Sequence, residues 1–175
     1  MVALLRGINV GGRARLPMTE LRSTLVDLGL RDVETYLQSG NVVLESGDRA
    51  VTGLAGRIEL AIAETFGLQI RVILREREDL VAVARSHPFL DTEADPSRIH
   101  VVFLEVVPEA DKVAALDPNR SPSDQFEVIG REIYLRYPNG QGRSKLSLDY
   151  FERVLGIAGT ARNWNTVTKL LEMLS

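Results

Sequence analysis

Short apolar runs alternate along this chain with segments in which every third or fourth residue is apolar. The first pattern is typical of buried strands and the second of amphipathic helices. In the first half these patterns predict strands at residues 2–8, 33–38, 41–45 and 68–74, and helices that open at Pro17 and Val51 and end before Gly29 and Gly67. The resulting order, β-α-β-β-α-β, is that of a ferredoxin-like unit.

The same order of elements returns in the second half. Strands are predicted at residues 99–107, 126–129, 132–137 and 160–162, helices at 109–116 and 147–155, and a closing helix at 165–174. We therefore predict an α+β fold of two ferredoxin-like (β-α-β-β-α-β) subdomains, an internal duplication, with a C-terminal helix. The first subdomain is expected at residues 1–76, a connecting helix and loop at 77–98, and the second subdomain with the C-terminal helix at 99–175.

The pair Ser39-Gly40 separates two predicted strands and indicates a tight hairpin turn. Such turns need a backbone conformation that glycine adopts without steric cost. We therefore expect a positive φ at Gly40.

The composition, 45% hydrophobic and 26% charged, is ordinary for a soluble globular protein. The chain contains no cysteine, which excludes a disulfide framework and a thiolate nucleophile and fits a reducing cytoplasm. No apolar run is long enough for a signal peptide or a membrane-spanning helix. The sequence thus predicts a cytoplasmic protein with no membrane partner.

The net charge of −3 argues against a protein that coats nucleic acid by bulk electrostatics. The charge is unevenly placed, however. Residues 1–22 carry four arginines against one glutamate, and residues 140–169 carry five basic against two acidic residues, a balance of +3 in each segment. Residues 23–139 carry 12 basic and 20 acidic residues, a balance of −8. The basic segments are either solvated surface or an anion-binding region.

Three short motifs in these basic segments suggest phosphate or carboxylate recognition. They are G-I-N-V-G-G at residues 7–12, G-Q-G-R-S-K at 140–145 and R-N-W-N-T at 162–166. Glycine-rich backbone, cations and a helix start are features that bind such anions. The candidate ligand-binding residues are Arg6, Asn9, Gly11, Gly12, Arg143, Ser144, Lys145, Arg162, Asn163, Trp164 and Asn165.

Each motif also has a structural explanation. Taken alone, the first motif is better explained as a plain turn between strand and helix. The second can be a flexible loop whose charges face water. Trp164, the only tryptophan, is either a stacking face or a core anchor.

Catalytic and metal signatures are absent from the sequence. His87 and His100 fall in different predicted elements without an H-E-x-x-H pattern, so we expect no metal site. His100 is expected to be a buried, satisfied core residue, whereas His87, at a helix end, favours a charged or hydrogen-bonded imidazole. Ser39 and Ser144 are candidate nucleophiles for which no base is identifiable. No motif requires a cofactor, and the sequence leaves open whether the protein is an enzyme.

Four runs carry a resemblance to a known family: L-L-R-G-I-N-V-G-G at residues 4–12, T-Y-L-Q-S-G-N-V-V at 35–43, Y-P-N-G-Q-G-R-S-K-L at 137–146 and T-A-R-N-W-N-T-V-T-K-L at 160–170. With them the chain resembles the bacterial domain-of-unknown-function 1697 family (DUF1697). The resemblance implies two ferredoxin-like subdomains and no activity. The chain has H-P-F at residues 87–89, where the family more often has N-P-F. This departure argues against a special role for the imidazole of His87.

Three functions remain open. The first is binding of a phosphate-bearing or other anionic ligand, a nucleotide or nucleic acid, although the net charge does not indicate nucleic acid. The second is an enzyme that acts on a small anionic substrate. The third is a structural or partner-binding protein in which the motifs only shape turns. The first function predicts that Arg6, Arg143 and Arg162 converge on one surface around an anion.

Overall fold

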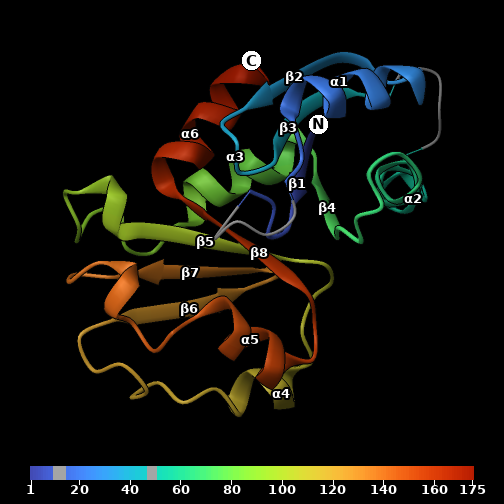
Figure 1. Cartoon of the computed structure of the whole chain (residues 1–175). Helices are drawn as coiled ribbons and strands as arrows, with labels where there is room; N and C mark the ends of the chain where they lie inside the picture. Colours follow the sequence, from blue (N-terminus) through green and yellow to red (C-terminus); the bar gives the residue numbers. More distant parts are fainter. Residues whose placement is uncertain (10–14, 47–50) are drawn as a thin grey trace. The chain divides into compact units, whose positions relative to one another are not determined.

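The computed structural model describes residues 1–9, 15–46 and 51–175. The chain divides into two compact units, Met1–Leu80 together with Leu170–Ser175, and Val81–Lys169. Each unit contains a four-stranded antiparallel sheet with helices interleaved between its strands (Figure 1). The predicted α+β class is therefore confirmed. In the part of the chain that is described, no helix has the length and apolar character needed to cross a bilayer.

The first unit has the predicted order of elements. They are β1 (Val2–Leu5), α1 (Met18–Asp27), β2 (Arg31–Tyr36), β3 (Asn41–Glu45), α2 (Leu54–Phe66) and β4 (Val72–Arg75). The sheet order is β2-β3-β1-β4, so β1 pairs on both of its sides. Its core joins both helices to one sheet face and includes Leu21 of α1, Ile58 of α2 and Leu5 of β1. The helix α3 (Arg77–Ser86) follows β4 along the chain.

The second unit repeats this arrangement. Its elements are η1 (Pro96–Arg98), β5 (Ile99–Leu104), α4 (Ala110–Ala114), β6 (Gln125–Ile129), β7 (Glu132–Arg136), η2 (Gln141–Arg143), α5 (Leu148–Leu155), β8 (Gly159–Asn163) and the start of α6 (Trp164–Met173). From Leu170 onward α6 belongs to the first unit. The sheet order is β6-β7-β5-β8, the counterpart of the first sheet. Its core includes Leu104 of β5, Leu135 of β7 and Phe151 of α5.

The register between the first and the last strand is the same in the two sheets. In the first sheet Leu5 lies opposite Val72 and Val2 opposite Arg75. In the second sheet Leu104 lies opposite Gly159 and Val101 opposite Arg162. Each first strand thus ends opposite the start of the last strand, and an arginine occupies the fourth position of each last strand. Two units with this shared register fit an internal duplication.

A glutamate contact at the outer edge is also repeated. The carbonyl of Arg71 points toward β1, where it accepts a hydrogen bond from the N–H of Arg6. The N–H of Val72, in the same peptide unit, therefore points away from the sheet. The Oε1 atom of Glu59 accepts that N–H at 2.8 Å. Likewise, Ala158 accepts from Glu105 at 3.0 Å, and Glu152 Oε1 accepts the outward N–H of Gly159 at 2.8 Å. A carboxylate therefore blocks the first free donor of both edge strands, β4 and β8, which discourages pairing with another chain.

Several predicted strands are shorter in the structure, and the run predicted at 2–8 ends as β1 at Leu5. The run at 99–107 ends its pairing at Leu104, opposite the first residue of β8, and Val106 and Val107 are exposed by 55% and 64%. The run at 68–74 starts its pairing only at Val72. An apolar run shows a tendency to be buried but does not reveal where the partner strand stops.

The predicted positive φ at Gly40 is confirmed, at 78°. The constraint is steric as well as conformational. A Cβ atom on Gly40 would lie 2.7 Å from the Cβ of Leu5 and 2.8 Å from the Cδ1 of Ile8, both in the first core. Gly67, which ends α2, has a similar φ of 67° but nothing within 4 Å of such a Cβ.

This pair of glycines gives a matched test of the hairpin. Gly67→Ala introduces only left-handed strain and should cost about 1 kcal/mol of unfolding free energy. Gly40→Ala adds overpacking of the core and should cost about 2–4 kcal/mol. Urea denaturation of both variants measures the difference, and equal losses would contradict the steric account.

Candidate functional site

The antiparallel pairing of β5 brings two of the predicted motifs to one end of the second sheet. Ile99, the first residue of β5, lies opposite Arg136 at the end of β7, and His100 lies opposite Asn163 at the end of β8. The loop after β7 and the start of α6 therefore leave the sheet at the same end, which we call the Ile99 end (Figure 1). Because β5 lies between β7 and β8, the two chain segments leave the sheet roughly 10 Å apart, or two strand spacings.

The loop at residues 137–147, which we call the basic loop, has a backbone fixed by local hydrogen bonds. The N–H of Gly140, a residue with φ of 83°, donates to Tyr137 O at 2.9 Å. The N–H of Ser144 donates to Gln141 O at 3.0 Å, closing η2. The hydroxyl of Ser144 accepts the N–H of Leu146 at 2.9 Å. The loop is thus a series of closed turns.

Side chains from the rest of the second unit hold the far end of the basic loop. Arg120 donates through Nε to Lys145 O at 2.9 Å while its guanidinium lies 4.2 Å from the ring centroid of Tyr150. The buried hydroxyl of Ser121 accepts the N–H of Lys145 at 3.4 Å and donates to Asp124 at 2.5 Å. The neighbouring 117–124 loop therefore braces the basic loop.

The cationic side chains of the basic loop are not part of this bracing. Arg143 and Lys145 are both exposed. Neither has an ion-pair or hydrogen-bond partner for its charged group among the described residues. Ser144, between them, is half-buried, and its hydroxyl already accepts the Leu146 N–H. The fixed backbone thus presents two exposed positive charges to solvent.

The third motif is mostly internal. Arg162 is 7% exposed, and its Nη1 donates to Thr160 Oγ1 and to Ala161 O, both at 2.7 Å. Burial lowers the pKa of Arg162 to about 10. Asn163 caps α6, because its Oδ1 accepts the N–H of Thr166 at 2.9 Å. Only Asn165 of the predicted set is exposed here.

Trp164 packs in an aromatic cluster with His87. Its ring meets the His87 ring edge-on at a centroid distance of 4.9 Å, and Tyr134 meets the same imidazole at 4.9 Å. The Nε2 atom of His87 is buried and makes no hydrogen bond of good geometry. Burial lowers the pKa of His87 to about 4, although backbone groups of His87 and His100 raise it slightly. The imidazole is neutral, and its Nδ1 accepts the N–H of Phe89 at 3.3 Å. Of the two states that its sequence position favours, the structure shows the hydrogen-bonded one and not the charged one.

His100 is buried as predicted, but not fully satisfied. Its ring meets the Tyr137 ring edge-on at 5.1 Å, and its buried Nδ1 has no hydrogen-bond partner. Burial lowers the pKa of His100 to about 4 and raises the pKa of Tyr137. Among the residues that the structure describes, no three His, Asp or Glu side chains gather as metal ligands would.

The N-terminal motif lies in the first unit. The amide of Asn9 donates to Leu16 O at 3.0 Å and to Gln38 O at 2.7 Å, and its oxygen accepts the Leu16 N–H at 2.9 Å. This side chain therefore bonds both Leu16 and the turn between β2 and β3. Gly11 and Gly12 fall outside the described residues.

Arg6 is half-buried and belongs to the first unit, whereas Arg143 and Arg162 belong to the second. Their convergence on one surface stays a prediction.

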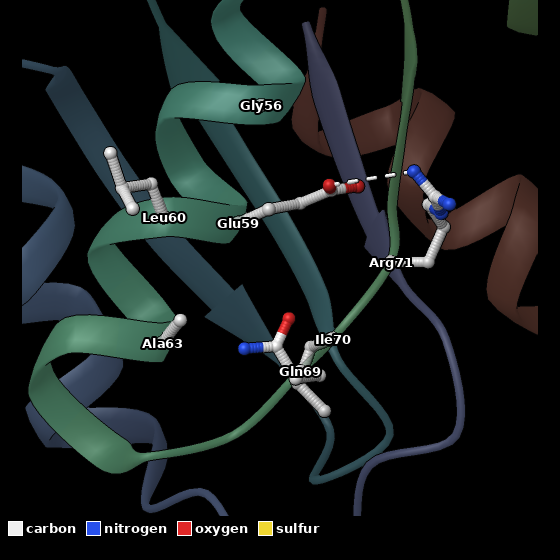
Figure 2. A pocket seen from close by; sticks show the side chains of 7 residues that line it. All are labelled: Gly56, Glu59, Leu60, Ala63, Gln69, Ile70 and Arg71. Carbon is white, nitrogen blue, oxygen red and sulfur yellow. Dashed lines mark ion pairs between the residues drawn. The ribbon is translucent and has the colours of Figure 1, made fainter.

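A pocket that the sequence did not indicate lies in the first unit. It has a volume of about 420 Å³ and is lined by Gly56, Glu59, Leu60, Ala63, Gln69, Ile70 and Arg71 (Figure 2). The one carboxylate of the pocket, that of Glu59, already has two partners. It accepts the N–H of Val72 and forms an ion pair with Arg71 at 3.6 Å. The remaining wall is largely apolar, and Leu60 is 58% exposed. The one sequence signal was Leu60 itself, a leucine among the polar positions of α2.

By its fold, the chain is an α+β protein that consists of two ferredoxin-like units. The chain belongs to the family described as "Protein of unknown function (DUF1697)", whose model matches residues 1–134. The basic loop and the start of α6 lie beyond that match. The chain is also similar to a solved structure described as that of a conserved bacterial protein, SP0830, from Streptococcus pneumoniae. That structure is 25% identical with a TM-score of 0.75, and the similarity covers 99% of this chain and 97% of that one. None of the curated proteins compared with the chain matches it.

The two buried histidines make the stability depend on pH. Their pKa values of about 4 in the folded protein lie below the ordinary value of about 6.5 in an unfolded chain. Between these values the unfolded state binds more protons, so their contribution is complete above pH 6.5 and is lost as the pH falls toward 4.

Nuclear magnetic resonance titration of the imidazole C–H signals tests this prediction. We expect His87 and His100 to stay neutral in the folded protein down to about pH 4–5. The variant His87→Phe, which keeps an aromatic ring, should show a shallower loss of stability between pH 6.5 and 5. Titration of both signals near pH 6.5 in the folded protein would contradict the burial account.

Proposed function

We propose that the protein binds a phosphate-bearing or other anionic ligand, such as a nucleotide or a nucleic acid, at the basic loop. The observation that carries the proposal is the contrast within that loop. Arg120 and Tyr137 donate hydrogen bonds that fix the chain, and the Ser144 hydroxyl accepts another. The side chains of Arg143 and Lys145, by contrast, remain exposed. A fixed loop loses little conformational entropy on binding, so its charges act on a ligand at low cost.

The chemistry of the loop suits an oxyanion. A guanidinium matches two oxygens of a phosphate or carboxylate, and an ammonium adds a compact charge. Gly140 and Gly142 have nothing within 4 Å of the position of a Cβ atom, so the backbone there is open to a ligand. Asn165, exposed at the same Ile99 end, supplies an amide. In this proposal Arg162, Asn163 and Trp164 support the start of α6 and do not contact the ligand.

The burial of the third motif favours a second candidate function, a protein in which these motifs serve the fold and no ligand binds. Alanine at Arg143 and at Arg162 separates the two. Under the binding proposal, Arg143→Ala loses affinity at unchanged stability and Arg162→Ala loses stability. Under the structural alternative the protein binds no anion specifically, so neither substitution changes anion binding.

The direct test removes the two exposed cations. Arg143→Ala and Lys145→Ala should each weaken binding of a nucleotide about tenfold, the value of roughly one charge-assisted hydrogen bond. Isothermal calorimetry at low and at physiological salt measures the affinity, which should fall as salt rises. Arg153→Ala is the matched control, because Arg153 is an exposed cation on α5 outside the loop. Equal effects of all three substitutions would show only diffuse charge attraction and defeat the proposal.

A further inference from the structure

None of the aromatic side chains of the chain falls in the exposed class. Its one tryptophan, four tyrosines and five phenylalanines all lie within the described residues, and each is buried or half-buried. At the Ile99 end, Trp164 packs against His87 and Tyr137 packs against His100. The hydroxyl of Tyr137 also donates to Leu146 O at 2.9 Å. Both rings, including that of Trp164, which the sequence left as a possible stacking face, pack inside the protein.

This arrangement bears on which part of a ligand is recognised. Proteins that bind single-stranded nucleic acid combine a positive groove along the backbone with aromatic rings on which the bases stack. Here the rings are covered, and the net charge of the whole chain is −3. A base would meet no exposed aromatic side chain, whereas a phosphate group meets the two exposed cations of the basic loop.

Two neighbouring cations also favour one kind of phosphate. A phosphate monoester carries a charge of about −1.5 to −2 at neutral pH and three terminal oxygens. A phosphate diester, as in a nucleic acid backbone, carries a single negative charge and two free oxygens. Arg143 with its planar fork and Lys145 with its compact charge together match the monoester.

We infer that the basic loop recognises the terminal phosphate of a small phosphate monoester and does not read a base, which places the ligand among phosphorylated metabolites and not among nucleic acids. This inference rests on the proposed function and narrows it. Arg143 and Lys145 bind the phosphate oxygens, and the rest of the ligand lies toward solvent.

A panel of four ligands tests the inference on the full chain. Ribose 5-phosphate carries a phosphate monoester without a base, and adenosine 5′-monophosphate carries a monoester and a base. Cyclic adenosine 3′,5′-monophosphate carries a base with a phosphate diester. A short single-stranded oligonucleotide without terminal phosphate carries bases, and all its phosphates are diesters. We expect ribose 5-phosphate and adenosine monophosphate to bind within about threefold of each other. The two diesters should bind at least tenfold more weakly. Arg143→Ala should weaken both monoesters alike, and Arg153→Ala neither.

The outcomes separate the inference from the proposed function. Adenosine monophosphate binding tenfold tighter than ribose 5-phosphate would overturn the inference, as would tighter binding of either diester. If that binding were still lost in Arg143→Ala, the proposed function would stand. Failure of all four ligands to bind at low salt would overturn both.

Discussion

The antiparallel pairing of the central strand with both of its neighbours is the constraint on which the second unit depends. Because β7 and β8 both run against β5, their last residues lie beside its first two, Ile99 and His100. The basic loop and the start of α6 are 17 or more residues apart in sequence, yet this register places them at one end of one sheet. A shift of β5 by one residue would reverse which side chains face the core, so the core that fixes the register also fixes the site.

The duplication helps to separate residues that serve the fold from residues that serve a ligand. The edge glutamates Glu59 and Glu152 bond the last strand in both halves. The arginines Arg75 and Arg162 occupy matching positions and are buried in both. A feature that both halves keep is explained by the fold. The cations Arg143 and Lys145 have no such counterpart. In the first half the connection between β3 and α2, residues 46–53, carries one aspartate and one arginine, so its charges cancel.

The sequence was sufficient for the order and type of the elements, because apolar periodicity and glycine stops are local signals. It also predicted the strained turn at Gly40, where only glycine fits. It could not show that Arg162 and Trp164 turn inward, because side-chain direction in a short strand and at a helix start depends on the register of β8 against β5. Nor could it show that the amide of Asn9 already bonds the backbone of Leu16 and Gln38. Of the candidate site, the sequence therefore found the charged loop but not which of its polar groups were already bonded.

The most direct test of the account is a two-dimensional ¹H–¹⁵N resonance titration of the full chain with inorganic pyrophosphate, a probe with no base and no sugar. The account predicts saturable shifts concentrated in the amides of the basic loop, with smaller shifts at the start of α6 and none around Arg153. Those shifts should disappear in the variant with both Arg143→Ala and Lys145→Ala. Saturable shifts centred on the α2 pocket of Figure 2, or shifts spread evenly over the exposed arginines, would contradict it.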